Sequence, residues 1–397
     1  MTVRDVAMDA GPGAKAASTI VATAARIAEE VAGPASADVD RDARFPHEAL
    51  DALRAERLLG ALVPTGLGGL GATIPDVAGA TFELGKRCAS SAMVFAMHHM
   101  QASCLVRHGR TPALEQYLSD LAARQLLLAS ATTEVGVGGD VRTSICALER
   151  SDGRFRLQKA APVISYGEHA DAVLATARRG PDSASSDQVL VLCTPPGLSL
   201  RATSGWDTLG FRGTCSLGFA LEAEGDEALV LPDSFGDIST ETMLPVSHVL
   251  WSAVWLGIAS AAVDTARKCV QAEARKSPGA TPATAPHLAE LTVVYQQMAE
   301  LVRTMAREFE RSADDRESLS RMSVAIAFNN LKISSSRMVI DIVGRAMGIC
   351  GMAGYREDSP HSLGRLLRDA HAAPLMVNND RLIANNAQFL LAAKEIQ

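Results

Sequence analysis

Three histidines lie in sequence contexts where an imidazole could move a proton. His98 and His99 are adjacent in AMHHMQA, within an otherwise apolar helical pattern, and His248 follows Ser247 near the start of a long apolar helix. A neutral imidazole has a reference pKa of about 6.5, which suits a general base near neutral pH. A histidine on an apolar face is, however, more often a hydrogen-bonded core residue, and His248 also fits a solvated helix start. Both interpretations stay open at this point.

A glycine-rich segment is the second candidate for chemistry. Residues 133–140 read TEVGVGGD and follow a short apolar strand pattern. Glycines after a strand let backbone N–H groups approach a flat, electron-rich ring or a pyrophosphate closely. A dinucleotide-binding G-x-G-x-x-G loop is excluded because no helical pattern follows the glycines. The alternative is a simple turn.

Other common kinds of site are not indicated. The seven cysteines are odd in number and show no C-x-x-C spacing, so we expect no zinc site, no disulfide framework and a cytoplasmic setting. No metal-ligand spacing, P-loop or Ser/His/Asp order stands out. Lys+Arg 38 against Asp+Glu 45 gives a net charge of -7, which argues against nucleic acid or an anionic membrane as a partner. We also predict no signal peptide and no membrane span.

The elements that must position these residues change character twice along the chain. The apolar period is helical to about residue 127, alternates in short runs to about residue 231, and is helical again from about residue 245. We therefore predict a helical N-terminal domain (1–128), a middle antiparallel β domain (129–236) and a C-terminal four-helix bundle (237–397). Trp251 and Trp255 lie four apart on a helix too apolar to face water, so we expect a homodimer or homotetramer interface on these helices.

This α–β–α plan resembles the acyl-CoA dehydrogenase superfamily, and six local matches occur in the family's order. TEVGVGGD resembles the family's T-E-P-G-x-G-S-D, VISYG (163–167) resembles W-I-T-N-G, and GWDTLGFRGTCS (205–216) resembles L-G-x-R-G-T-x-S. In the C-terminal third, RKSPG (275–279), GICGMAGY (348–355) and RLLRDAHA (365–372) resemble R-x-x-F-G, Q-x-x-G-G-x-G-Y/F and R-x-x-R-D-A. The resemblance implies an FAD-dependent enzyme that desaturates an acyl thioester.

The resemblance also implies which residues hold FAD. Thr133 would bond to the flavin ring and the Ser165 hydroxyl would lie near N5, where a donor stabilises the reduced ring. Arg275 would reach the pyrophosphate of a neighbouring subunit, although Pro278 replaces the aromatic residue of its R-x-x-F-G motif. In the separate Q-x-x-G-G-x-G-Y/F motif, Gly348 replaces the glutamine. The expected cofactor-binding residues are Ala131, Thr132, Thr133, Gly138, Gly139, Ile164, Ser165, Arg275, Gly348, Gly351, Asn378 and Asn379.

The base that the family reaction needs is missing. Desaturation requires a desolvated carboxylate to take the weakly acidic α-proton. The commonest position of that glutamate is eight residues after Asp369, which is Val377, and the alternative position matches Ser247. His248 is therefore our first candidate for the base. His98 or His99 is the second, since the resemblance places their helix under the acyl group.

Three functions remain open. The first, which we expect, is an FAD-dependent oxidoreductase acting on an acyl-CoA or acyl-carrier-protein thioester with a non-standard base and an external electron acceptor. The second is a flavin monooxygenase of the same fold, in which a separate reductase supplies reduced flavin and a histidine handles protons. The third is a non-redox member that keeps the fold as a scaffold. Val377 and Ser247 count against the first function, while Thr133, the glycine turn and Ser165 count against the third.

Overall fold

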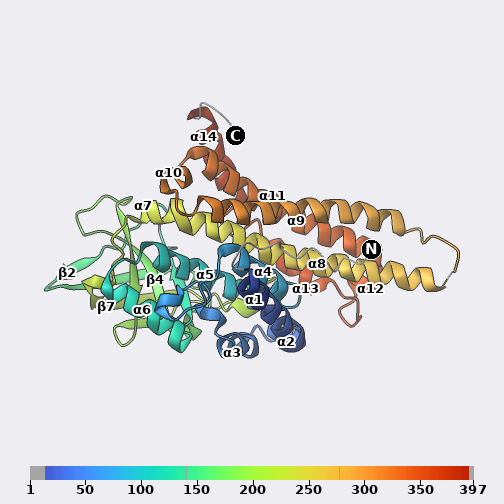
Figure 1. Ribbon diagram of the computed structural model, residues 1–397, viewed down its shortest axis with the longest axis horizontal. Coiled ribbons are helices and arrows are strands. Elements are labelled where there is room, and N and C mark those ends of the chain that lie inside the picture. The colour runs from blue at the N-terminus through green and yellow to red at the C-terminus, as the bar shows by residue number, and fades with distance from the viewer. Residues whose placement is uncertain (1–13, 139–140, 277, 393–397) are drawn as a thin grey trace.

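The computed structural model describes residues 14–138, 141–276 and 278–392. Helices form the first third of the chain, strands the middle, and helices again the last third (Figure 1), which confirms the predicted fold class. The strands gather at one end of the molecule, at the left in Figure 1. The connection between two long C-terminal helices, α8 and α9, lies at the opposite end.

The N-terminal helices begin where side chains can cap them. Thr73 and Asp76 form a reciprocal capping box at the start of α4, and Thr111 caps α6 just before a proline. Helix α5 is buried along most of its length and forms the centre of this part of the fold. The helices are α1 (Ala14–Ile27), α2 (Gly33–Arg41), α3 (His47–Ala55), α4 (Ile74–Gly85), α5 (Ala89–His108) and α6 (Pro112–Arg124).

The strands form two small sheets. The order is β1-β4-β5 in one sheet and β2-β3-β7-β6 in the other. Strand β3 alternates exposed and buried side chains, as a half-buried strand should, whereas β4 and β5 are almost entirely buried. The strands are β1 (Leu128–Ala131), β2 (Glu149–Ser151), β3 (Arg154–Ala161), β4 (Ala172–Arg178), β5 (Gln188–Cys193), β6 (Leu198–Ala202) and β7 (Phe219–Asp226).

One strand pair differs from the predicted antiparallel arrangement. Strand β1 pairs with β4 in parallel, while the other described pairs of named strands are antiparallel. Two parallel strands need a long connection, and here β2 and β3 of the other sheet lie between them in sequence. Alternation within each strand reports which face is buried and carries no information on the direction of its partner.

Two long helices of the C-terminal domain run side by side in the same direction. The ring of His248, near the start of α8, bonds to the backbone of Phe328 near the start of α11, and Cys269 contacts Cys350 near their other ends. The helices are α7 (Phe235–Ile238), α8 (Leu244–Lys276), α9 (Ala285–Ser312), α10 (Arg316–Leu319), α11 (Met322–Cys350), α12 (Met352–Tyr355), α13 (Gly364–Ala372) and α14 (Asn379–Ala392).

Helix α8 meets the N-terminal domain at a very close crossing. A Cβ atom on Gly257 would lie 2.7 Å from the backbone carbonyl oxygen of Phe82, and one on Gly85 would lie 2.9 Å from that of Val254. Neither distance leaves room for a side chain, so these two glycines let α4 and α8 touch. The crossing fixes the end of α4 against the middle of α8.

The two tryptophans on α8 are buried within the chain. Trp255 is fully buried and Trp251 is 7% exposed. They therefore give no reason for a subunit interface, and the expected homodimer or homotetramer stays a prediction. The continuous helical stretch Phe235–Lys276 is apolar and long enough to span a membrane, but 83% of its most apolar window is buried inside the protein, as in a core helix.

Candidate active site

A buried ion pair between Glu134 and Lys159 anchors the glycine-rich segment that follows β1. Glu134 accepts hydrogen bonds from the Ser144 hydroxyl (2.7 Å) and the Cys146 N–H (2.7 Å), and the Lys159 ammonium lies 3.4 Å away. Burial works against the charge on Glu134, but these bonds and Lys159 keep its pKa below the ordinary value. The carboxylate thus fixes the segment that presents Thr133.

The surroundings of Thr133 fit a flat aromatic ring. Its hydroxyl donates to the Val163 carbonyl oxygen at 3.2 Å. Val163 and Val135, two residues after Thr133, are 37% and 59% exposed. Exposed apolar groups beside a hydroxyl suit a ring with an apolar face and polar edges. Ser165 is nearly buried and accepts a hydrogen bond from the Ser216 hydroxyl at 2.8 Å, which leaves its own proton free to donate. The residues present therefore fit a flavin ring.

The other residues predicted to bind the flavin ring differ in whether side chain or backbone atoms are accessible. The side chains of Ala131 and Ile164 are fully buried, so only their backbone could serve a cofactor. Gly138 has a φ of +60° and its carbonyl oxygen accepts a bond from Arg381 at 2.7 Å. Gly139 lies outside the described residues.

His98 is bonded to backbone on both sides of its ring. Its Nε2 atom donates to the Leu59 carbonyl oxygen at 2.7 Å, and its Nδ1 atom accepts from the Leu128 N–H at 3.1 Å. Burial lowers the pKa of His98 to about 4. His99 donates to the Leu58 carbonyl oxygen at 3.1 Å and is also fully buried. These contacts tie α5 to the 58–60 turn and to β1, and they fit a structural role.

His248 keeps one ring nitrogen without a partner. Its Nδ1 donates to the Phe328 carbonyl oxygen at 3.1 Å, while the buried Nε2 has no partner among the described residues. Burial, together with the charge of nearby Lys332, lowers the pKa of His248 to about 3. A lone pair is therefore available, but it belongs to a weak base at neutral pH.

A buried lysine occupies the region where the family's glutamate is expected. Lys332 on α11 is fully buried, and its ammonium donates to the Val377 carbonyl oxygen at 2.8 Å and to the Asn379 side-chain oxygen at 2.7 Å. Burial lowers the pKa of Lys332 to about 7. Within the described residues it has no carboxylate partner, and the Trp255 ring lies 5.9 Å from its nitrogen.

The turn that Lys332 holds has an unusual backbone. Val377 has a φ of +46°, which is a strained conformation for a β-branched residue. The buried Asn379 also bonds to Ser336, whereas the exposed Asn378 accepts a bond from the Asp380 N–H at the start of α14. Both asparagines expected at FAD thus have protein partners in this structure.

The predicted pyrophosphate residues lie together at the far end of the C-terminal domain. Arg275 is exposed at the end of α8, and Gly348 and Gly351 are at the end of the neighbouring α11. The apolar side chains of Met352 and Tyr355 are 67% and 68% exposed beside this turn. The structure therefore brings these residues together at the ends of α8 and α11, whereas the strands gather at the opposite end of the molecule (Figure 1).

Helix α13 links this turn to the β domain. Asp369 is buried and accepts a hydrogen bond from the Phe211 N–H at 2.6 Å. Burial raises the pKa of Asp369 to about 6, although that hydrogen bond opposes the shift. No three His, Cys, Asp or Glu side chains in the described part of the chain are placed to hold a metal ion.

Sequence reasoning missed Lys332. A usable signal was present, because Lys332 is the lone lysine between residues 277 and 393, in a segment whose other strong bases are arginines. It also lies in a largely apolar stretch, AIAFNNLKI, and a lysine buried in such a stretch is rare unless it has a specific partner.

Two family models match the chain. The acyl-CoA dehydrogenase N-terminal domain matches residues 15–125, and the acyl-CoA dehydrogenase C-terminal domain matches residues 237–376. Together they cover more than half of the chain. The strands β1 to β7 lie between the two matched segments.

Similar proteins catalyse more than one reaction. The chain is 27% identical to the amino sugar nitrososynthase DnmZ of Streptomyces peucetius, over 86% of this chain and 85% of that one. It is 26% identical to the probable FMNH2-dependent monooxygenase SfnC of Pseudomonas putida, over 82% and 84%. The structure of butyryl-CoA dehydrogenase from Megasphaera elsdenii has the same fold, with a TM-score of 0.83 at 18% identity, over 97% of this chain and 100% of that one.

Proposed function

Because this chain belongs to the acyl-CoA dehydrogenase family, we propose that it is a flavin-dependent monooxygenase of that family which oxidises a heteroatom of a small organic substrate. Reduced flavin from a separate reductase supplies the electrons with which one atom of O2 enters the substrate and the other leaves as water. The desaturation that we expected from the sequence is the competing function.

The observation that carries this proposal is that neither position of the family's catalytic base carries a carboxylate, while a buried lysine contacts the backbone at the commoner position. Val377 occupies the commonest position of the base, and its carbonyl oxygen binds the Lys332 ammonium. At the alternative position, the Ser247 hydroxyl donates to the Leu244 carbonyl oxygen at 2.8 Å within its own helix. Neither the Val377 side chain nor the helix-bonded Ser247 hydroxyl is a carboxylate that could take an α-proton. Oxidation of a nitrogen or sulfur atom needs no such step.

The chain's own residues supply binding, orientation and proton control. Thr133 and Ser165 would hold the ring edge with their hydroxyls, and the exposed Val135 and Val163 would offer the ring apolar contact. Lys332 holds the Val377–Asn379 turn and, with a pKa near 7, can bind or release a proton at Nζ under physiological conditions. We assign it as a positioning residue.

The flavin that we propose is reduced FMN. The chain departs from the family at the pyrophosphate and adenine end, where Pro278, Gly348 and Met352 replace motif residues. The similarity to an FMNH2-dependent monooxygenase supports the smaller flavin. FAD, which the sequence resemblance implies, is the alternative, and the binding of both flavins can be compared directly.

The test separates oxygenation from desaturation. Purified protein is loaded with oxidised FMN or FAD and mixed anaerobically with a panel of acyl-CoA thioesters, and the visible absorbance of the flavin is followed. We expect no bleaching. In the second arm, a flavin reductase and NADH supply reduced FMN in air, and amines and thioethers are screened for products that have gained one oxygen atom. Bleaching by any thioester, with no oxygenated product, contradicts the proposal.

A further inference from the structure

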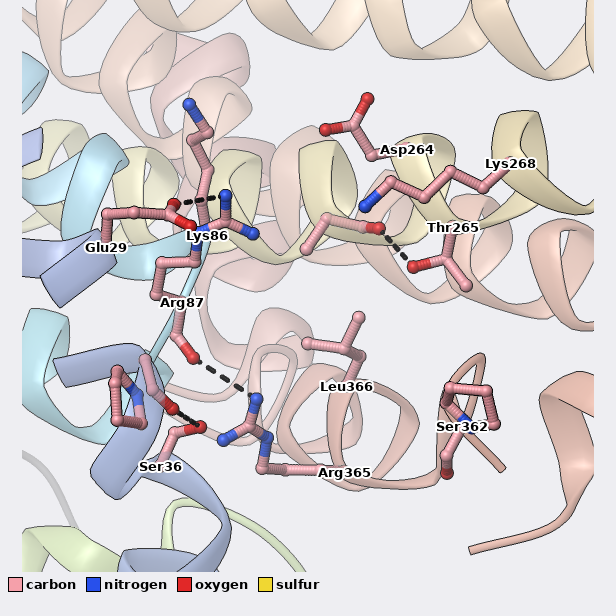
Figure 2. A pocket seen from close by; sticks show the side chains of 14 residues that line it. Glu29, Ser36, Lys86, Arg87, Asp264, Thr265, Lys268, Ser362, Arg365 and Leu366 are labelled. Carbon is pink, nitrogen blue, oxygen red and sulfur yellow. Dashed lines mark hydrogen bonds and ion pairs between the residues drawn. The ribbon is translucent and has the colours of Figure 1, made fainter. Parts of the chain in front are cut away.

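A polar cleft lies between the two helical domains, apart from the residues assigned to the flavin. It has a volume of about 460 Å³ and is bounded by α2 with the turn before it, the end of α4, the middle of α8 and the start of α13 (Figure 2). Clefts at domain junctions are common ligand sites, and this volume suits a small metabolite. The Gly85–Gly257 crossing brings α4 and α8 together at this place.

Two cations in the cleft form no ion pair in the described part of the chain, although the charge of Arg365 acts on the buried Asp369 one turn further along α13. The cleft is lined by Lys86, Arg87, Lys268 and Arg365 and by only two carboxylates, Glu29 and Asp264. Glu29 forms an ion pair with Arg87, Asp264 binds Arg267, and Lys86 binds Glu83 from outside the cleft. Within the described residues, neither Lys268 nor Arg365 forms an ion pair. The cleft is thus locally basic in a chain of net charge -7.

Arg365 is held in place with one donor unused. Its Nη2 atom donates to the Arg87 carbonyl oxygen at 3.2 Å, while its Nη1 atom is buried without a partner in the described structure. A buried guanidinium donor needs an acceptor, which a water molecule or an oxygen atom of a bound ligand can supply. Figure 2 shows Arg365 rising from α13 and Lys268 reaching in from α8.

We infer that this cleft binds the phosphate or pyrophosphate group of a small phosphorylated metabolite, with Lys268 and Arg365 as its principal ligands. Arg offers a fork of donors that matches phosphate oxygens, and Lys adds a point charge. The buried Leu366 leaves room for only a little apolar contact, which fits a ligand dominated by its anionic group. This site is independent of the proposed oxygenation.

The site can be tested with pyrophosphate and with inorganic phosphate as probes. Each is titrated calorimetrically into the full-length protein at constant ionic strength, with sulfate as a comparison anion. We expect saturable binding of pyrophosphate with a Kd of about 1 mM or tighter. Lys268 is exposed and can be replaced without disturbing the core, so Lys268→Gln should weaken binding about tenfold. Arg124→Gln removes one exposed positive charge on α6 and should change nothing.

Two further variants make the result decisive. Arg365→Lys keeps the charge but loses the fork, and should weaken binding about fivefold or more. Arg275→Gln alters the predicted flavin pyrophosphate region and should leave probe binding unchanged. The inference is overturned if neither probe binds saturably, if Lys268→Gln binds as tightly as the parent, or if Arg275→Gln alone abolishes binding.

Discussion

The ammonium of Lys332 lies 2.8 Å from the backbone carbonyl oxygen of Val377, the residue at the commonest position of the family's catalytic glutamate. The cation contacts the backbone of the turn, and the side chain of that position is an apolar group. Because Asn379 and Ser336 complete the contacts, the turn is held by uncharged acceptors. Its strained backbone is thereby fixed without a carboxylate.

Replacing Lys332 should change the pH dependence of stability. In the folded protein its pKa is lowered to about 7, whereas in the unfolded chain it is near the reference value of about 10.4. Between these values the unfolded state binds more protons, so the free energy of unfolding rises with pH, by up to about 1.4 kcal/mol per pH unit from this group. In Lys332→Met this rise should disappear. Urea unfolding between about pH 7.5 and pH 9.5 measures it.

The control for that experiment is an exposed lysine. Lys268→Met removes a lysine from the surface of α8 and should keep the slope of the parent protein. Equal slopes for Lys332→Met and the parent would mean that Lys332 titrates normally.

Introducing a glutamate at position 377 tests the shape of the pocket. We expect Val377→Glu to remain unreactive toward acyl thioesters, because the surroundings serve a different reaction. Anaerobic bleaching of bound flavin by a thioester panel is the measurement, with Val377→Gln as a control of equal size and no charge. Bleaching in the glutamate variant alone would show that the pocket still accepts a thioester, and would restore desaturation as the ancestral or present function.

Truncating His98 should cost stability. In His98→Ala the Leu59 carbonyl oxygen and the Leu128 N–H both lose their partner inside the protein, and a cavity forms. We expect the free energy of unfolding to fall by about 2–4 kcal/mol. His371→Ala, at an exposed position on α13, should change it by less than about 0.5 kcal/mol. A His98→Ala protein of normal stability with greatly reduced activity would instead support the catalytic role predicted for this residue.

Asp369 should tolerate an amide but not an apolar group. Its folded-state pKa of about 6 exceeds the unfolded value of about 3.9, so its contribution to stability falls as pH rises between these values. Asp369→Asn keeps an acceptor for the Phe211 N–H, and should be as stable as the parent or more so at pH 7.5. Asp369→Ala should lose about 2 kcal/mol. Thermal unfolding of both variants near pH 4.5 and pH 7.5 checks the direction and the pH dependence.

Hydrophobic periodicity predicted most of the elements because it reports burial. The helical period from about residue 245 corresponds to α8 (Leu244–Lys276) and the helices that follow it. Among the short alternating runs before residue 231, β3 has alternate exposed and buried side chains. The parallel β1–β4 pair escaped prediction because pairing joins segments distant in sequence. The sequence also could not show what covers Trp255. An apolar helix face predicts burial, but the covering residues can belong to the same chain or to another subunit.

The candidate flavin residues were chosen from motif matches, and their role stays a prediction. The motif match at Thr133 led to a residue whose surroundings suit a flat ring. Lys332 could not be assigned in this way, because its importance depends on a backbone carbonyl 45 residues away in sequence. The sequence indicated His98 as a candidate base. It could not show that both ring nitrogens bond to the backbone of Leu59 and Leu128, because those residues are distant in sequence.

The length of α8 has a consequence for how flavin affinity responds to protein concentration. From His248 to Arg275 a continuous helix extends roughly 40 Å, at about 1.5 Å per residue, and its far end is away from the strands. Arg275 therefore cannot bend back to a flavin ring beside Thr133 of its own chain. If Arg275 binds the pyrophosphate of FAD, as the sequence resemblance implies, we expect that FAD to belong to a neighbouring molecule. Dilution should then weaken FAD binding, and a mixture of one variant defective at Arg275 and another defective at Thr133 should recover part of it.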